Sequence, residues 1–217
     1  MVEDLPAFLP TILSVVSLSL LPFLVVMGTA FTKISIVLLL LRNAMGVQQA
    51  PSGLIINALA LTLTIFIMYP VGNAILVEIR AQELTLQDWD SSVQIYEVIS
   101  GTFVDHLNRH TTERELDFIM SAAMRLWPEE LHGQIHGENI FLLLPAHVTS
   151  EITKAFQIAF LIFLPFVIID MVVSNILLAM GAMMVPPMLV SLPLKILLFV
   201  AADGWSRLLQ SLILSYA

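Results

Sequence analysis

The sequence predicts an all-α integral membrane protein with about four hydrophobic helices, arranged as two kinked hairpins, and one small acidic helical insertion. Of its 217 residues, 58% are hydrophobic and only 12% are charged, whereas a soluble globular chain carries about 25% charged residues. The mean hydropathy is +0.92. The chain contains no cysteine, so neither disulfides nor thiolate metal sites contribute to its stability.

The apolar runs give the expected hairpins. A hydrocarbon core about 30 Å thick takes about 20 helical residues, so we expect helices at roughly 10–41 and 54–77 in a first hairpin covering residues 1–77. A second hairpin covering residues 143–217 has expected helices at roughly 152–179 and 188–213. Pro22, Pro165 and Pro193 fall inside apolar segments, where lipid cannot replace a lost backbone hydrogen bond. We therefore expect kinked helices in a tight assembly that need not span the bilayer simply.

Residues 78–142 form the acidic insertion. Its stretch from Glu78 to Glu138 holds twelve of the seventeen acidic residues and four of the nine basic ones, so it carries the whole net charge of −8. Apolar residues at helical spacing predict a water-exposed helix that ends at Trp127 and Pro128. The acidic balance argues against nucleic acid or an anionic membrane surface as its partner. We expect the insertion on the outer side of the membrane.

Six charged residues lie in or at the ends of apolar runs: Lys33, Glu151, Lys154, Asp170, Lys195 and Asp203. A charge at the bilayer centre costs about 2.5 to 3.5 kcal/mol, so such residues normally face a partner or a wet cavity. Glu151 and Lys154 are three residues apart and could pair on one helix face. Asp170 and Ser174 form a polar stripe that another helix could meet.

A methionine-rich segment, reading ILLAMGAMMVPPM, interrupts the second hairpin. Its expected seal consists of Met180, Gly181, Ala182, Met183, Met184 and Val185. Unbranched thioether side chains repack easily, so a row of them beside a helix breaker suits a surface that must close against a variable shape. Ordinary core filling is the alternative interpretation of the same methionines.

The sequence offers no case for an enzyme, a metal site or a cofactor. His106 and His110, like His132 and His136, are four residues apart, a spacing that can hold a metal on a helix. No third ligand is placed by the sequence, and a solvated helix face explains both pairs. Phosphate-binding loops of the GxxxxGK[ST] type, GxSxG turns and HExxH motifs are absent from the sequence.

Four ordered blocks carry a family resemblance: LLRNAMGVQQAP (40–51), LLPAHVTSEITKAFQIAFLIFLPFVIIDMV (143–172), NILLAMGAMMVPP (175–187) and LPLKILLFVAADGW (192–205). They resemble the signature blocks of the SctR/FliP family, the inner-membrane export-gate proteins of bacterial type III secretion systems and flagella. The RNAMGVQQ stretch is more similar to the virulence branch. The resemblance covers both hydrophobic halves but not the insertion.

The resemblance implies a homo-pentamer that assembles with SctS-like and SctT-like membrane proteins and passes unfolded substrates across the inner membrane. The family's methionine gasket corresponds to Ala182, Met183 and Met184, with alanine in the first place. An ion pair between subunits would fall on Glu151 and Lys195. From the charges alone, a secondary transporter or ion channel that uses Lys33, Asp170 and Lys195 as a relay is the alternative.

Overall fold

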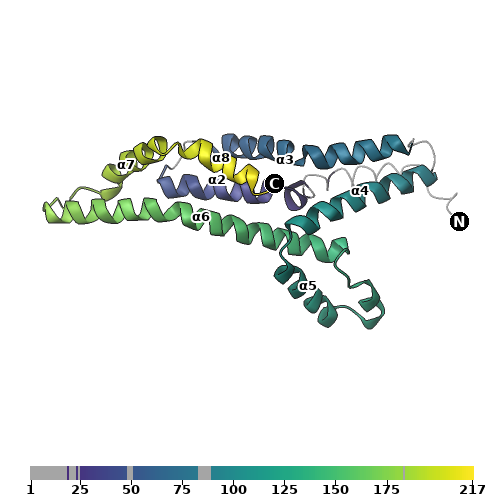
Figure 1. Ribbon diagram of the computed structural model, residues 1–217. Coiled ribbons are helices and arrows are strands. Elements are labelled where there is room, and N and C mark those ends of the chain that lie inside the picture. The colour runs from purple at the N-terminus through teal and green to yellow at the C-terminus, as the bar shows by residue number, and fades with distance from the viewer. Residues whose placement is uncertain (1–18, 20–22, 24, 48–50, 83–88, 183) are drawn as a thin grey trace.

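The computed structural model describes residues 19, 23, 25–47, 51–82, 89–182 and 184–217, and every regular element within these residues is a helix. The prediction of an all-α protein is therefore confirmed. In chain order the elements are α2 (Phe31–Met45), α3 (Gly53–Ala81), α4 (Trp89–His110), α5 (Glu113–Leu126), the 3-10 helix η1 (Glu129–Gln134), α6 (Ile140–Ala179), α7 (Pro187–Ala201) and α8 (Gly204–Leu214). Figure 1 shows an elongated molecule with α6 along its length.

Helix α2 packs against α3, α6 and α7. Its Ile34 and Val37 are completely buried, and Ala155 of α6 lies in the same apolar cluster. Small residues such as alanine allow two helices to approach closely. The helix ends at Gly46, whose left-handed conformation (φ 75°) is one that glycine adopts without steric cost.

Helix α6 begins twelve residues before the expected start at 152. The side chain of Asn139 caps it by accepting a hydrogen bond of 2.9 Å from the backbone N–H of Phe141. At 1.5 Å per residue the 40-residue helix is about 60 Å long, which is about twice the thickness of a hydrocarbon core. Glu151 therefore lies inside a helix and not at its boundary.

The helix expected at 188–213 is divided in two. Helices α7 and α8 meet at a bend of 61°, and Asp203 at the junction has a left-handed backbone (φ 53°, ψ 42°) that stops α7. The ring of Phe199 fills the space where a side chain on Gly204 would lie. The absence of a Cβ at Gly204 thus lets α8 start directly against the end of α7.

The acidic segment forms α4 and a projecting arm. Helix α4 packs on α3 and α6, whereas α5 and η1 leave the body of the molecule as an arm (Figure 1). Helix α5 ends at Leu126 and is capped by Trp127, immediately before Pro128, in agreement with the predicted end at Trp127 and Pro128. Helix α3 continues past residue 77 to Ala81, and α6 starts at Ile140. The first and last residues of the expected insertion, 78–142, therefore belong to long apolar helices.

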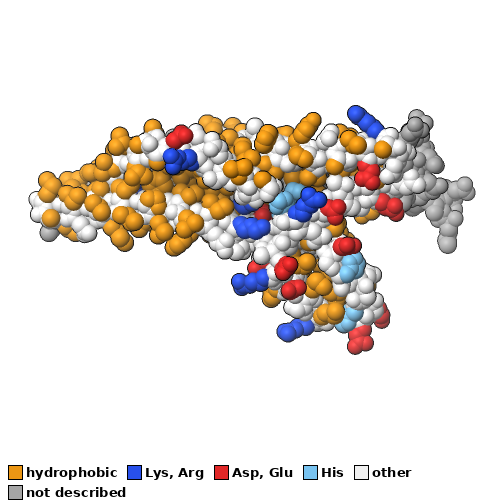
Figure 2. Space-filling view, viewed as in Figure 1, with side chains coloured by type: hydrophobic (Ala, Val, Ile, Leu, Met, Phe, Trp, Pro, Cys, Tyr) orange, Lys and Arg blue, Asp and Glu red, His pale blue; other side chains and the backbone are white. Residues whose placement is uncertain are grey.

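Two of the described helices, Gly53–Ala81 and Ile140–Ala179, are long and apolar enough to cross a membrane, and the bent pair of α7 and α8 is a third candidate. The helix predicted at 10–41 is described from residue 25 onward and at residues 19 and 23. The rest of its first part lies outside the described residues. Figure 2 shows hydrophobic side chains covering the end of the molecule formed by α6 and α7, while charged side chains gather around α4 and α5.

Candidate functional site

Three of the predicted charges meet around one buried carboxylate. Glu151 of α6 is fully buried, and its carboxylate lies 3.6 Å from Nζ of Lys33 and 3.5 Å from Nζ of Lys154. Lys33 of α2 is only 2% exposed, whereas Lys154 is 36% exposed. The local pair of Glu151 and Lys154 is present, and Lys33 is the additional partner that joins α2 to α6.

The C-terminal end of the chain completes this cluster. The hydroxyl of Tyr216 donates a hydrogen bond to Glu151, and the Lys33 ammonium lies 3.5 Å from the centre of the Tyr216 ring, a cation–π geometry. Burial, followed by the Glu151 charge, raises the pKa of the Tyr216 phenol. Tyr216 therefore remains a hydrogen-bond donor at physiological pH. Sequence reasoning did not identify this residue, because an isolated tyrosine after the last helix carries no pattern.

Three histidines surround the cluster. The ring centres of His106 and His110 on α4 are 4.9 Å apart, and the ring of His147 on α6 is 6.3 Å from that of His106. Burial lowers the pKa of His106 to about 4 and also lowers the pKa of His110, which keeps both rings neutral at pH 7. Sequence reasoning overlooked His147, although His147, Ser150, Glu151 and Lys154 have helical spacing and mark a polar face of α6.

The histidine pairs give no metal centre in the described part of the chain, where no group of three or more suitable side chains comes together. His132 lies in η1, and its Nε2 is 3.1 Å from the carbonyl oxygen of Trp127. The pair of His132 and His136 therefore does not share one face of an α-helix, which the spacing argument requires.

Asp170 and Lys195 form a second charged site. Nζ of Lys195 on α7 lies 2.6 Å from Oδ2 of Asp170 on α6, and it also donates to the carbonyl oxygen of Ala44 at 3.3 Å. Lys195 is nearly buried, while the Asp170 side chain is 46% exposed. The helix predicted to meet the polar stripe at Asp170 is thus α7. Asp203 lies apart, exposed at the bend between α7 and α8.

The structure does not bring Glu151 and Lys195 together within one chain, because each has other partners. Their proposed contact is between subunits, and the single chain does not test it. That pairing stays a prediction.

The methionine-rich segment forms the tip of the α6–α7 hairpin. The N–H of Gly181 bonds to the carbonyl oxygen of Leu178 at 3.0 Å, and the N–H of Ala182 bonds to that of Leu177 at 2.9 Å. With the left-handed backbone of Gly181 (φ 72°), these two bonds form a Schellman motif that ends α6. Pro187 then starts α7.

Side chains of the tip project away from the protein. Met184 is 97% exposed and Met180 is 75% exposed, and Val185 and Met188 are exposed as well. Met183, which belongs to the predicted seal, lies outside the described residues. The tip therefore presents thioether side chains that make little contact with their own chain.

Residues 13–212 match the family model described as the FliP family. The chain belongs to the FliP family. FliP family members are membrane proteins of secretion systems, in agreement with the apolar helices described above.

Individual relatives indicate the branch of the FliP family to which this chain is most similar. It is 43% identical over 213 residues to the Yop proteins translocation protein R of Yersinia pestis, covering 98% of both chains. It is 39% identical to the hypersensitivity response secretion protein HrcR of Ralstonia nicotianae, covering 96% of this chain and 97% of the relative. The virulence protein YscR of Salmonella typhimurium is 39% identical, with 92% and 93% covered. These names support the injectisome branch, called SctR, as the resemblance implied.

Proposed function

We propose that this chain is the core subunit of a type III secretion export gate. Five copies, together with SctS-like and SctT-like membrane proteins, form a pore through which unfolded proteins cross the bacterial inner membrane. The gate acts without catalysis, and its acidic insertion lies on the periplasmic side. The α6–α7 tip closes the pore at rest.

The observation that carries this proposal is the geometry of the hairpin tip. A Schellman motif at Gly181 and a proline start at Pro187 fix the backbone on both sides of the tip. The side chains of Met180 and Met184 are nevertheless free of internal contacts over most of their surface. A fixed backbone with adaptable thioether side chains suits a seal that opens around chains of variable shape.

The length and surface of α6 support an assembly. Because the helix is about 60 Å long, the bilayer core can cover only about half of it. Apolar side chains are exposed along much of it, including Phe160, Ile168 and Ile176. Contacts with other subunits would cover the apolar surface that lipid does not reach.

The test of the seal is the double substitution of Met183 and Met184 by alanine. We expect the closed gate to leak ions and small molecules while the multimer still assembles, because alanine leaves an open space at the tip. Membrane conductance and sensitivity of cells to small toxic molecules measure the leak. Met171→Ala is the matched control, since Met171 is 62% exposed on α6 but lies away from the tip.

A double variant that assembles and remains as tight as the wild type contradicts the proposed seal. Native mass spectrometry of the detergent-extracted protein, alone and with its co-expressed neighbours, tests the assembly. A homogeneous pentamer that recruits two small membrane proteins is the expected result. A monomer or dimer that conducts ions by itself would instead support the transporter alternative.

A further inference from the structure

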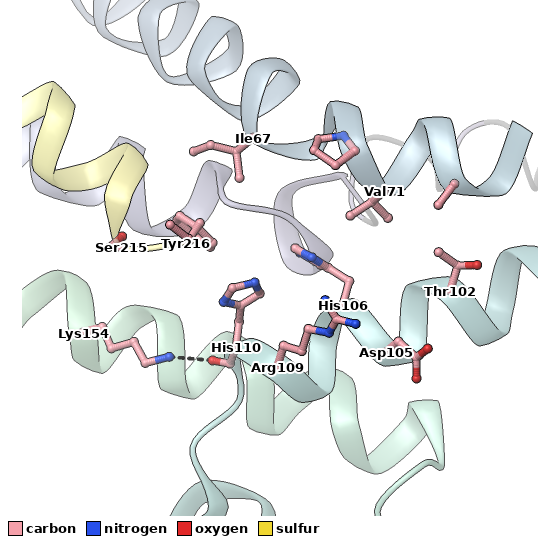
Figure 3. Close-up of a pocket in the computed structure, with 13 residues that line it drawn as sticks. Ile67, Val71, Thr102, Asp105, His106, Arg109, His110, Lys154, Ser215 and Tyr216 are labelled. Atoms are coloured by element: carbon pink, nitrogen blue, oxygen red, sulfur yellow. Dashed lines mark hydrogen bonds between the residues drawn. The ribbon is translucent and has the colours of Figure 1, made fainter. Parts of the chain in front are cut away.

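A cavity of about 720 Å³ lies between α3, α4, α6 and the C-terminal end of the chain. Its volume is in the range of pockets that hold small ligands. The wall formed by α3 is apolar and includes Ile67, Pro70 and Val71. The opposite wall is formed by polar side chains (Figure 3), which are His106, Arg109 and His110 of α4 and Lys154 of α6.

The polar wall offers hydrogen-bond donors that the chain itself does not use. Nε2 of His106 is buried without a hydrogen-bond partner among the described residues, and the residue is only 6% exposed. Arg109 takes part in none of the ion pairs found in the described residues. Figure 3 shows His106, His110 and Arg109 extending toward the space between the walls.

The buried charged cluster beside this wall has a surplus of one positive charge. Lys33 and Lys154 share the single carboxylate of Glu151, so one positive charge of the cluster has no counterpart. Lys154 uses its ammonium for the Glu151 carboxylate and for the carbonyl oxygen of His110, at 2.6 Å, which leaves one of three protons available. Asp105 also lines the cavity, but its carboxylate points away from the two imidazoles (Figure 3).

An apolar groove of about 300 Å³ adjoins the cavity and shares Ile67, Pro70 and Tyr216 with it. The groove extends over Phe66, Tyr69 and Leu214, of which Phe66 is 65% exposed and Tyr69 is 71% exposed. Its wall belongs to α3, one of the helices long enough to cross a membrane. A polar chamber and an apolar groove thus meet at one opening.

We propose that the cavity binds the phosphate group of an anionic phospholipid, whose acyl chain lies along the groove. Arg109 and Lys154 supply charge and hydrogen bonds to the phosphate, and the His106 ring lines the same wall. Free phosphate shares the headgroup chemistry but leaves the groove empty. An acidic protein segment would leave the apolar groove uncovered as well. Because the insertion as a whole is acidic, binding depends on these local donors and not on long-range attraction.

The experiment uses the full chain as purified in detergent, in its multimeric state. Dioctanoyl-phosphatidylglycerol, dioctanoyl-phosphatidylcholine and inorganic phosphate are titrated separately, and the rise of the melting temperature and bound mass by native mass spectrometry give the affinities. We expect phosphatidylglycerol to bind at least about tenfold more tightly than phosphatidylcholine or phosphate. Removing one charged hydrogen-bond donor, in Arg109→Gln, should weaken phosphatidylglycerol binding about tenfold.

Arg80→Gln is the matched control, because Arg80 is an exposed arginine on α3 outside the cavity. It should bind as the wild type does. His106→Ala provides a second cavity variant should Arg109→Gln fail to assemble, and it too should weaken binding.

Equal affinities for phosphatidylglycerol and phosphatidylcholine would overturn the proposal. So would unchanged binding in both assembled cavity variants. Phosphate that binds as tightly as phosphatidylglycerol would show a site for the free ion and exclude the lipid. Binding of a glutamate-rich peptide, without binding of phosphatidylglycerol, would instead assign the cavity to an acidic protein partner and overturn the proposal.

Discussion

Replacing Glu151 by glutamine tests the buried cluster most directly. Among the described residues, the change removes the only carboxylate that pairs with Lys33, which is 2% exposed, while the amide keeps the shape of the side chain. Removing one partner of a buried ion pair costs about 3 to 5 kcal/mol, because the remaining charge stays buried without compensation. For a chain of this size, that loss corresponds to a fall in melting temperature of about 6 to 20 °C.

The geometry also predicts an order among related variants. Lys33→Met should cost less, about 1 to 2 kcal/mol, because Glu151 keeps Lys154 and the Tyr216 hydroxyl as partners. Asp170→Asn should cost about 1 to 3 kcal/mol, because Lys195 is only 7% exposed and keeps the carbonyl oxygen of Ala44 as a partner, while Asp170 itself is 46% exposed. Glu151→Gln is therefore expected to be the most damaging of the three.

Thermal unfolding of the purified proteins in one detergent, followed by intrinsic fluorescence, measures this order. Size-exclusion chromatography before heating establishes that each sample has the same assembly state, because association changes the apparent stability. A melting temperature for Glu151→Gln within about 2 °C of the wild type would refute the reasoning. A larger loss in Lys33→Met than in Glu151→Gln would refute it as well.

Three further predictions concern the tip, the subunit contact and the histidines. Gly181→Ala places a Cβ on a left-handed residue (φ 72°) and should lower the stability of the tip by about 1 kcal/mol. Faster proteolysis at the tip measures this loss. Gly72→Ala is the control, because a Cβ at Gly72 meets open space on α3 and should not destabilise the protein. The single substitutions Glu151→Lys and Lys195→Glu should each abolish the multimer and secretion, and the double swap should recover part of both; if the double variant is no better than the worse single one, the two residues are not partners between subunits. Because the pKa of His106 is lowered from 6.5 to about 4, its contribution to stability is present above pH 6.5 and is lost as the pH falls toward 4, so melting temperatures of His106→Gln between pH 7 and 5 should fall less than those of the wild type.

The helical class was predictable because long apolar runs leave few other structures for the chain. The start of α6 was not predictable, because the polar residues just before position 152 suggested that the helix begins after them. In the structure they form a helix face, and Glu151 is buried against Lys33. The bend at Asp203 was missed because hydrophobic periodicity does not report a left-handed backbone at a residue other than glycine.

The site was predictable in part. The cost of burying charge identified Lys33, Glu151 and Lys195 as residues that need partners. Which residues pair depends on how α2 and α7 are aligned along α6, and sequence spacing contains no such information. Tyr216 and Lys33 are nearly at opposite ends of the chain, yet they meet at one carboxylate.

The continuity of α6 has a mechanical consequence. One continuous helix connects the region where α5 packs with the hairpin tip, so a push or rotation applied at the acidic arm is transmitted along α6 toward the methionines. Of the two prolines inside α6, Pro145 and Pro165, only Pro165 lies between Glu151 and the tip, and it lacks the N–H that would bond to the carbonyl of Leu161. Bending there would move the tip sideways while Glu151 and its partners stay in place, which makes Pro165 the natural pivot of the long helix.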